Sequence, residues 1–184
     1  MSEPVRRDRI YLTGFMGSGK STIGPIVANT IGYDFIDTDK EIERREGKSV
    51  NQIFEQNGAD YFRELERILV QELSARIGMV VSLGGGTIAD EVNFSIVKSS
   101  GILIYLQTSP EHLFRRLQNK TNRPTLRDEE GERLPPESLT TRISMLFDER
   151  EPFYKQADII VPTDDFRVGI TVDEIVKRLG PWLR

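Results

Sequence analysis

The chain has 184 residues and a formal net charge of −4, with charged and apolar fractions that are ordinary for a globular protein. This length favours a single domain spanning residues 1–184. The acidic balance argues against nucleic-acid or anionic-membrane partners, and no apolar run approaches the ~20 residues of a membrane span. Cysteine is absent and histidine occurs once, which excludes disulfides, thiol chemistry and a histidine metal cluster. We therefore expect a cytoplasmic protein, and we expect a monomer.

A short apolar segment leads into a glycine-rich loop that reads G-x-x-x-x-G-K-S over residues 14–21. Its glycines let the backbone turn tightly and direct N–H groups at an anion. Lys20 adds a cation that can reach terminal phosphates, and the Ser21 hydroxyl can ligate Mg²⁺. Apolar residues on helical spacing follow, and the dipole of such a helix favours phosphate at its N-terminus. The pattern predicts a nucleotide site, and a plain strand–helix turn is the alternative.

The rest of the chain alternates between strand and helix patterns. The predicted strands cover residues 9–13, 34–37, 79–83, 101–106 and 158–161. The predicted helices cover residues 20–31, 39–46, 49–58, 59–77, 90–99, 138–149 and 171–179, and a further helix begins after Ser109-Pro110. Pro152 is expected to end the helix that covers residues 138–149. This alternation predicts a doubly wound α/β domain with a parallel sheet.

Ligands in such folds bind at the carboxyl ends of the strands. The phosphate loop follows the first predicted strand, Asp37 and Asp39 follow the second, and the triplet Gly84, Gly85 and Gly86 follows the third. We therefore expect these motifs to meet at one edge of the sheet. One aspartate could face Mg²⁺ and the other a substrate hydroxyl, and capping of the next helix is the alternative.

Residues 119–137 are polar, rich in proline and without apolar periodicity, which is typical of a lid or a disordered loop. Arginines cluster around this segment: Arg115, Arg116, Arg123, Arg127 and Arg133. A mobile arginine that closes over phosphate would neutralise charge in the transition state. Solvated loop charge is the alternative. Spacing alone favours a surface ion pair for Arg63. For Arg150, at the end of a predicted helix, it favours a cation that complements the helix dipole.

The combined motifs resemble the shikimate kinase family over nearly the whole chain. The matching segments are Gly14 to Gly24, Asp37-Thr38-Asp39, Phe62-Arg63-Glu64, Leu83 to Gly86, Arg123-Pro124, and Arg150 with Tyr154. The resemblance implies a P-loop kinase fold of the nucleoside-monophosphate-kinase-like type, with a five-stranded parallel sheet in the order 2-3-1-4-5. It also implies substrate-binding helices over about residues 39–77 and a mobile lid over about residues 119–137.

The activity implied by the resemblance is ATP-dependent phosphorylation of the shikimate 3-hydroxyl, in the route to chorismate and aromatic amino acids. The residues expected to hold ATP are Gly17, Ser18, Gly19, Lys20, Ser21, Thr22, Arg116 and Arg123. Those expected to hold shikimate are Asp39, Arg63, Gly84, Gly85, Gly86 and Arg150.

The resemblance also assigns chemical roles. It implies that Asp39 is the base, that Lys20 and the lid residue Arg123 act on the transferred phosphate, and that Ser21 and Asp37 hold Mg²⁺. Other readings remain open at this point: another small-molecule P-loop kinase, acting on gluconate or a nucleotide, or an inactive homologue that only binds ligand.

Overall fold

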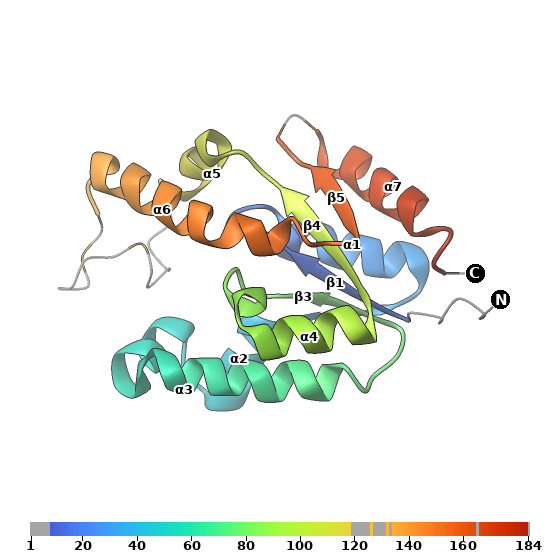
Figure 1. Ribbon diagram of the computed structural model, residues 1–184, viewed down its shortest axis with the longest axis horizontal. Coiled ribbons are helices and arrows are strands. Elements are labelled where there is room, and N and C mark those ends of the chain that lie inside the picture. The colour runs from blue at the N-terminus through green and yellow to red at the C-terminus, as the bar shows by residue number, and fades with distance from the viewer. Residues whose placement is uncertain (1–7, 119–125, 127–131, 133, 165, 184) are drawn as a thin grey trace.

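The computed structural model describes residues 8–118, 126, 132, 134–164 and 166–183. Within them lies one sheet of parallel strands in the order β2-β3-β1-β4-β5 (Figure 1). The strands are β1 (Arg9–Thr13), β2 (Asp34–Asp37), β3 (Met79–Ser82), β4 (Ile102–Gln107) and β5 (Ile159–Pro162). The predicted α/β fold and strand order are therefore confirmed.

Helices lie on both faces of this sheet, as parallel strands require (Figure 1). The helices are α1 (Lys20–Ile31), α2 (Thr38–Glu46), α3 (Val50–Leu73), α4 (Glu91–Ser100), α5 (Pro110–Leu117), α6 (Pro136–Tyr154) and α7 (Val168–Leu179), with a 3₁₀ turn η1 (Thr87–Ala89). Within the described residues, no helix combines the length and the apolar character that crossing a membrane needs.

Alternating side chains of the strands divide the core into two layers. Ile10 and Leu12 of β1 pack with the buried faces of α1 and α7, whereas Tyr11 points into the layer under α3, α4, α5 and α6. The same alternation holds along β4, where Ile104 and Tyr105 belong to opposite layers. This two-sided burial fixes the strand register and hence the position of every strand end.

Several helix boundaries differ from the sequence-based predictions, most of all in α3 and α6. Residues 49–58 and 59–77 form one element, α3, which carries non-helical backbone angles at Gly58 and ends at Leu73. Ile77, the last residue of the predicted helix 59–77, is 73% exposed because the chain has left the helix to enter β3. α6 does not end at Pro152 but continues to Tyr154, because the buried Arg150 and Tyr154 hold its last turn against the core.

A close contact between α1 and β2 gives a test of this packing. Gly24 is buried in α1, and an added Cβ would lie 2.3 Å from a ring carbon of Phe35. We expect Gly24→Ala to lower the free energy of unfolding by about 1–3 kcal/mol, measured by urea denaturation, because the ring must shift in a packed layer.

Gly169→Ala is the matched control, since a Cβ there meets nothing within 4 Å. It should leave stability unchanged or raise it by up to about 1 kcal/mol. Equal stabilities of the two variants would contradict the described packing of α1 on β2.

Candidate active site

The phosphate loop connects the end of β1 to the first residue of α1. Gly14, Gly17 and Gly19 have φ angles of 138°, 85° and 105°, which side-chain-bearing residues rarely adopt. At Gly14 a Cβ would also lie 2.7 Å from the carbonyl oxygen of Leu106. The loop conformation therefore depends on these glycines, and it presents backbone N–H groups at a helix N-terminus.

Lys20 is buried within this loop. Its ammonium donates hydrogen bonds to the carbonyl oxygens of Gly14 at 2.6 Å and Phe15 at 3.1 Å. The cation therefore sits against the loop backbone, at the centre of the anion site that the sequence predicts.

Ser21 and Asp37 meet beside the loop. The Ser21 hydroxyl donates to Asp37 Oδ2 at 2.7 Å, and the Ser82 hydroxyl donates to the same oxygen at 3.2 Å. Pairing of β2 with β3 brings this about, because Asp37 is the register partner of Ser82. Asp37 also caps α2, its Oδ1 accepting from the Lys40 N–H at 3.3 Å. The capping alternative for Asp37 is therefore confirmed, and its other carboxylate oxygen meets the Ser21 hydroxyl.

Asp39 lies in the first turn of α2, close to the glycine triplet. A Cβ at Gly84 would come within 2.9 Å of Asp39 Oδ1, of Glu66 Oε1 and of Thr87 Oγ1. No side chain fits at Gly84 without moving these groups. The triplet thus allows the backbone to run directly beside two carboxylates.

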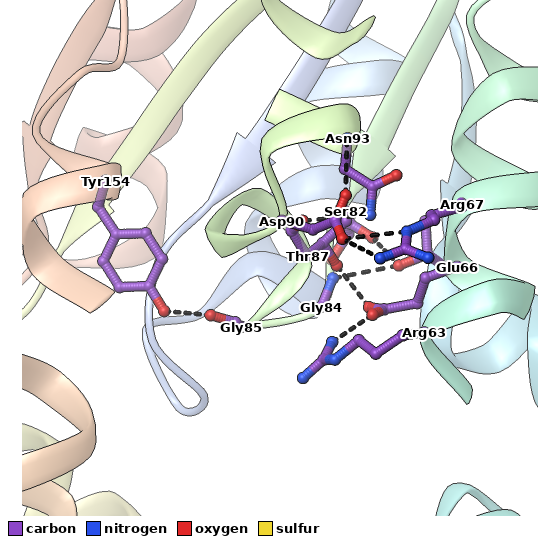
Figure 2. A network of polar contacts seen from close by, with 11 residues as sticks. Arg63, Glu66, Arg67, Ser82, Gly84, Gly85, Thr87, Asp90, Asn93 and Tyr154 are labelled. Carbon is purple, nitrogen blue, oxygen red and sulfur yellow. Dashed lines mark hydrogen bonds and ion pairs between the residues drawn. The ribbon is translucent and has the colours of Figure 1, made fainter. Parts of the chain in front are cut away.

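Glu66 is the functional neighbour that the sequence reasoning missed. It is 1% exposed, accepts a hydrogen bond from the Thr87 hydroxyl at 2.6 Å and forms an ion pair with Arg63 (Figure 2). Burial raises the pKa of the Glu66 carboxyl, and the charge of Arg63 opposes that rise. The signal for Glu66 was its position: it falls between Phe62 and Leu69 in the buried stripe of α3, where a charged residue needs a partner.

Two arginines approach the glycine triplet. A Cβ at Gly86 would lie 2.7 Å from Arg63 Nη2, and one at Gly85 would lie 3.6 Å from Arg150 Nη1. Arg150 is 9% exposed, and its guanidinium carbon lies 5.9 Å from the centroid of the Phe15 ring. Arg63 does form an ion pair, as spacing alone suggested, but its partner Glu66 is buried, and Arg150 is a buried residue near the end of α6.

The other end of the site is formed by α5 and the turn after β5. Arg116 donates to the carbonyl oxygens of Gly17 at 3.1 Å and Thr163 at 3.3 Å. Phe166 and Val168 line the cavity together with Arg116 and Thr163.

A cavity of about 520 Å³ joins these parts. It is lined by residues 16–23 of the phosphate loop and α1, by Asp37 and Asp39, by Gly84 and Gly85, and by Arg116 with the turn after β5. Gly86, Arg63 and Arg150 are not among the residues that line this cavity. Arg123, with most of the predicted lid, lies outside the described residues.

Comparison with known proteins decides the family. The shikimate kinase family model matches residues 16–180. The chain belongs to the shikimate kinase family. A shikimate kinase from Chlorobium phaeobacteroides is 48% identical over 95% of this chain and 88% of its own length. The predicted family and its activity, that of an ATP-dependent phosphotransferase acting on shikimate, are therefore confirmed.

Solved structures agree with this assignment. The shikimate kinase from Acinetobacter baumannii in complex with shikimate is 32% identical, with a TM-score of 0.85 over 94% of this chain and 92% of that one. A gluconokinase from Sinorhizobium meliloti, with a TM-score of 0.61 over 96% and 93% of the two chains, is only 19% identical and so shares the fold alone.

Replacement of the buried carboxylate of this shikimate kinase site gives a test of its electrostatics. Both carboxylate oxygens of Glu66 accept hydrogen bonds, one from Arg63 and one from Thr87. The amide of Glu66→Gln has only one oxygen, so its N–H₂ group must face one of these two donors in a buried position. We expect the free energy of unfolding to fall by about 1–3 kcal/mol in urea denaturation, because a buried donor then has no acceptor.

Glu64→Gln on the same helix is the control, because the Glu64 side chain is 62% exposed and pairs only weakly with Arg67 at 3.5 Å. It should change stability by less than about 0.5 kcal/mol. A Glu66→Gln protein as stable as the Glu64→Gln protein would contradict the buried network.

Proposed function

We propose that this shikimate kinase holds ATP along the phosphate loop and shikimate beside the glycine triplet, with Asp39 as the base for the 3-hydroxyl. The observation that carries this proposal is the shared cavity: Asp39 and Lys20 line the same space from opposite elements, α2 and α1. In phosphoryl transfer, a protein mainly positions the two reactants and offsets charge. A carboxylate on the acceptor side and an ammonium on the phosphate side are the complement such a reaction needs.

On the phosphate side, we assign the nucleotide to the loop residues Gly17, Ser18, Gly19, Lys20, Ser21 and Thr22. The fixed N–H groups of the loop and the N-terminus of α1 favour a polyanion, and Lys20 adds a full positive charge. We also retain Arg123 as the arginine that reaches ATP from the lid. These cations meet the nucleotide's charge locally, although the chain as a whole is acidic.

We assign Mg²⁺ to Ser21 and Asp37. The hydroxyl and the carboxylate oxygen already meet at 2.7 Å, and Mg²⁺ typically takes only one or two protein oxygens besides phosphate and water. No cluster of three or more acidic, histidine or cysteine ligands occurs among residues with described positions, which agrees with such a sparse site. When bound, Mg²⁺ would supply charge neutralisation for the phosphates of ATP.

On the acceptor side, we assign the shikimate carboxylate to Arg63 and Arg150, with the backbone of Gly84, Gly85 and Gly86 against the ring. A guanidinium binds a carboxylate through two parallel N–H groups, which a lysine cannot reproduce. Asp39 then faces the hydroxyls. A site with buried polar partners rejects analogues that leave them unpaired, so these residues also account for selectivity.

At the far end of the cavity, we assign the adenine to Arg116 and to the turn that carries Thr163, Phe166 and Val168. Two backbone carbonyls hold the Arg116 guanidinium in place, which suits stacking on a flat base. We further propose that the enzyme works as a cytoplasmic monomer, without a nucleic-acid or membrane partner. Its net charge of −4 supports the absence of such anionic partners.

Asp39→Asn tests the proposed base. We expect kcat for shikimate phosphorylation to fall by about 100- to 10,000-fold, because the amide cannot take the hydroxyl proton. The KM for ATP should stay within about twofold, because Asp39 faces the acceptor. A coupled assay for ADP release measures both, with Asp60→Asn on the exposed face of α3 as the control. A wild-type kcat in Asp39→Asn would remove Asp39 from the mechanism.

Arg63→Lys tests the carboxylate site while leaving a cation beside Glu66. We expect the KM for shikimate to rise about tenfold or more through loss of the planar fork, with the KM for ATP nearly unchanged. Arg67→Lys is the control, because Arg67 lies on the same helix but pairs with Asp90 outside the cavity. Equal effects on the two KM values would contradict the assignment of Arg63 to shikimate.

A further inference from the structure

Tyr154 is a buried residue for which the proposed chemistry has no use. It is the last residue of α6, 1% exposed, and its ring lies 5.2 Å from the ring of Tyr105 on β4. Burying a phenolic hydroxyl has a free-energy cost unless it is hydrogen-bonded. A tyrosine at this position therefore needs a hydrogen-bond partner for its hydroxyl.

The hydroxyl lies between two parts of the proposed shikimate site. It donates a hydrogen bond to the carbonyl oxygen of Gly85, at the centre of the glycine triplet (Figure 2). The Arg150 guanidinium, one helical turn earlier in α6, lies against the same glycine: a Cβ at Gly85 would be 3.6 Å from Arg150 Nη1 and 3.7 Å from the Tyr154 hydroxyl oxygen. The hydroxyl therefore ties the loop after β3 to the helix that carries Arg150.

The geometry of the triplet shows why such a connection matters. Gly84 is held by its N–H, which donates to the Thr38 hydroxyl at 3.1 Å, and by its carbonyl oxygen, which accepts from the Thr87 N–H at 3.1 Å. Figure 2 shows Tyr154 reaching Gly85 from α6, while Arg63 lies toward α3 on the other side of the loop. The two arginines proposed to bind one carboxylate therefore belong to separate elements, α3 and α6, that both approach this loop.

We propose that Tyr154 is a positioning residue for shikimate binding, whose hydroxyl fixes the Arg150 guanidinium and the Gly85 carbonyl relative to each other. This inference rests on the proposed use of Arg150 and Gly85 in the shikimate site. A guanidinium that is already oriented loses less side-chain freedom when it binds a carboxylate, so affinity for the acid rises. The hydroxyl acts through Arg150 and the loop and takes no part in the phosphate side of the cavity.

Tyr105 gives a matched control for the loss of a phenolic hydroxyl. It is buried to the same degree, and its ring is the partner of the Tyr154 ring. Its hydroxyl is buried without a hydrogen-bond partner in the described part of the chain. Tyr105→Phe therefore removes the same atom from the same aromatic pair without breaking a described contact to the site.

The test compares Tyr154→Phe with Tyr105→Phe in the full-length enzyme. We expect Tyr154→Phe to weaken shikimate binding, measured by titration calorimetry without ATP, by about five- to twentyfold, because the hydrogen bond that holds the Gly85 carbonyl beside Arg150 is lost. The KM for ATP should stay within about twofold, and Tyr105→Phe should bind shikimate like the wild type. Wild-type shikimate affinity in a folded Tyr154→Phe protein would overturn the proposal.

Two further proteins separate the possible failures. Incorporation of 4-aminophenylalanine at position 154 keeps the ring and an N–H donor, so it should restore most of the affinity for shikimate. If Tyr154→Phe does not fold, the 4-aminophenylalanine protein takes its place in the test, and weak shikimate binding by that protein would overturn the proposal.

Arg150→Lys tests the proposed carboxylate site, on which the role of Tyr154 rests. Unchanged shikimate affinity in Arg150→Lys would refute the proposed carboxylate site, whereas weak binding there with wild-type affinity in Tyr154→Phe would refute the role of Tyr154 alone.

Discussion

The site depends on close approach of side chains to the backbone at three successive glycines. Gly84 lies beside Asp39 and Glu66, Gly85 beside Arg150, and Gly86 beside Arg63. A side chain at Gly84 or Gly86 would occupy the space that a charged group now fills, whereas a Cβ at Gly85 would meet Arg150 only at an ordinary contact distance. Gly84 and Gly86 therefore allow charged groups from α2 and α3 to approach one short stretch of backbone after β3, where Arg150 of α6 also lies.

Charge balance explains why these groups can be brought together. Arg63 is paired with Glu66, whose other carboxylate oxygen is satisfied by Thr87. An isolated buried carboxylate would be costly, and so would an arginine fixed in a pocket without a counter-charge. The Arg63 guanidinium lies near Gly86 while it pairs with Glu66. Burial raises the pKa of the Glu66 carboxyl, and the charge of Arg63 opposes that rise. The ion pair thus holds the Arg63 guanidinium beside Gly86, where we propose that it binds the acid.

The phosphate side is organised by the backbone more than by side chains. Positive φ angles at the loop glycines curve the chain around the anion site, and Lys20 is held by two carbonyl oxygens of the same loop. The acceptor side is assembled from side chains on separate elements, such as Arg63 on α3 and Arg150 on α6. The phosphate loop is therefore encoded locally, while the proposed shikimate site depends on how α3 and α6 pack in one layer on the sheet.

This difference explains how far each part could be predicted. The strand order 2-3-1-4-5, the phosphate loop and the meeting of Asp37 with Ser21 followed from motifs and from the resemblance to a family. The predictions were wrong where packing overrode a local signal. α6 passes through Pro152 because Arg150 and Tyr154 are buried against the core, and α3 ends before Ile77 because the chain must turn into β3.

The sequence alone determined those parts of the site in which all the residues are close together along the chain. The loop from Gly14 to Ser21 forms one turn, so its composition fixes its conformation. Only the tertiary structure decided that Glu66 is the counter-charge of Arg63, and that the Tyr154 hydroxyl donates to the Gly85 carbonyl beside Arg150. Such contacts depend on how helices pack on a sheet, and spacing within one segment carries no information about a partner on another.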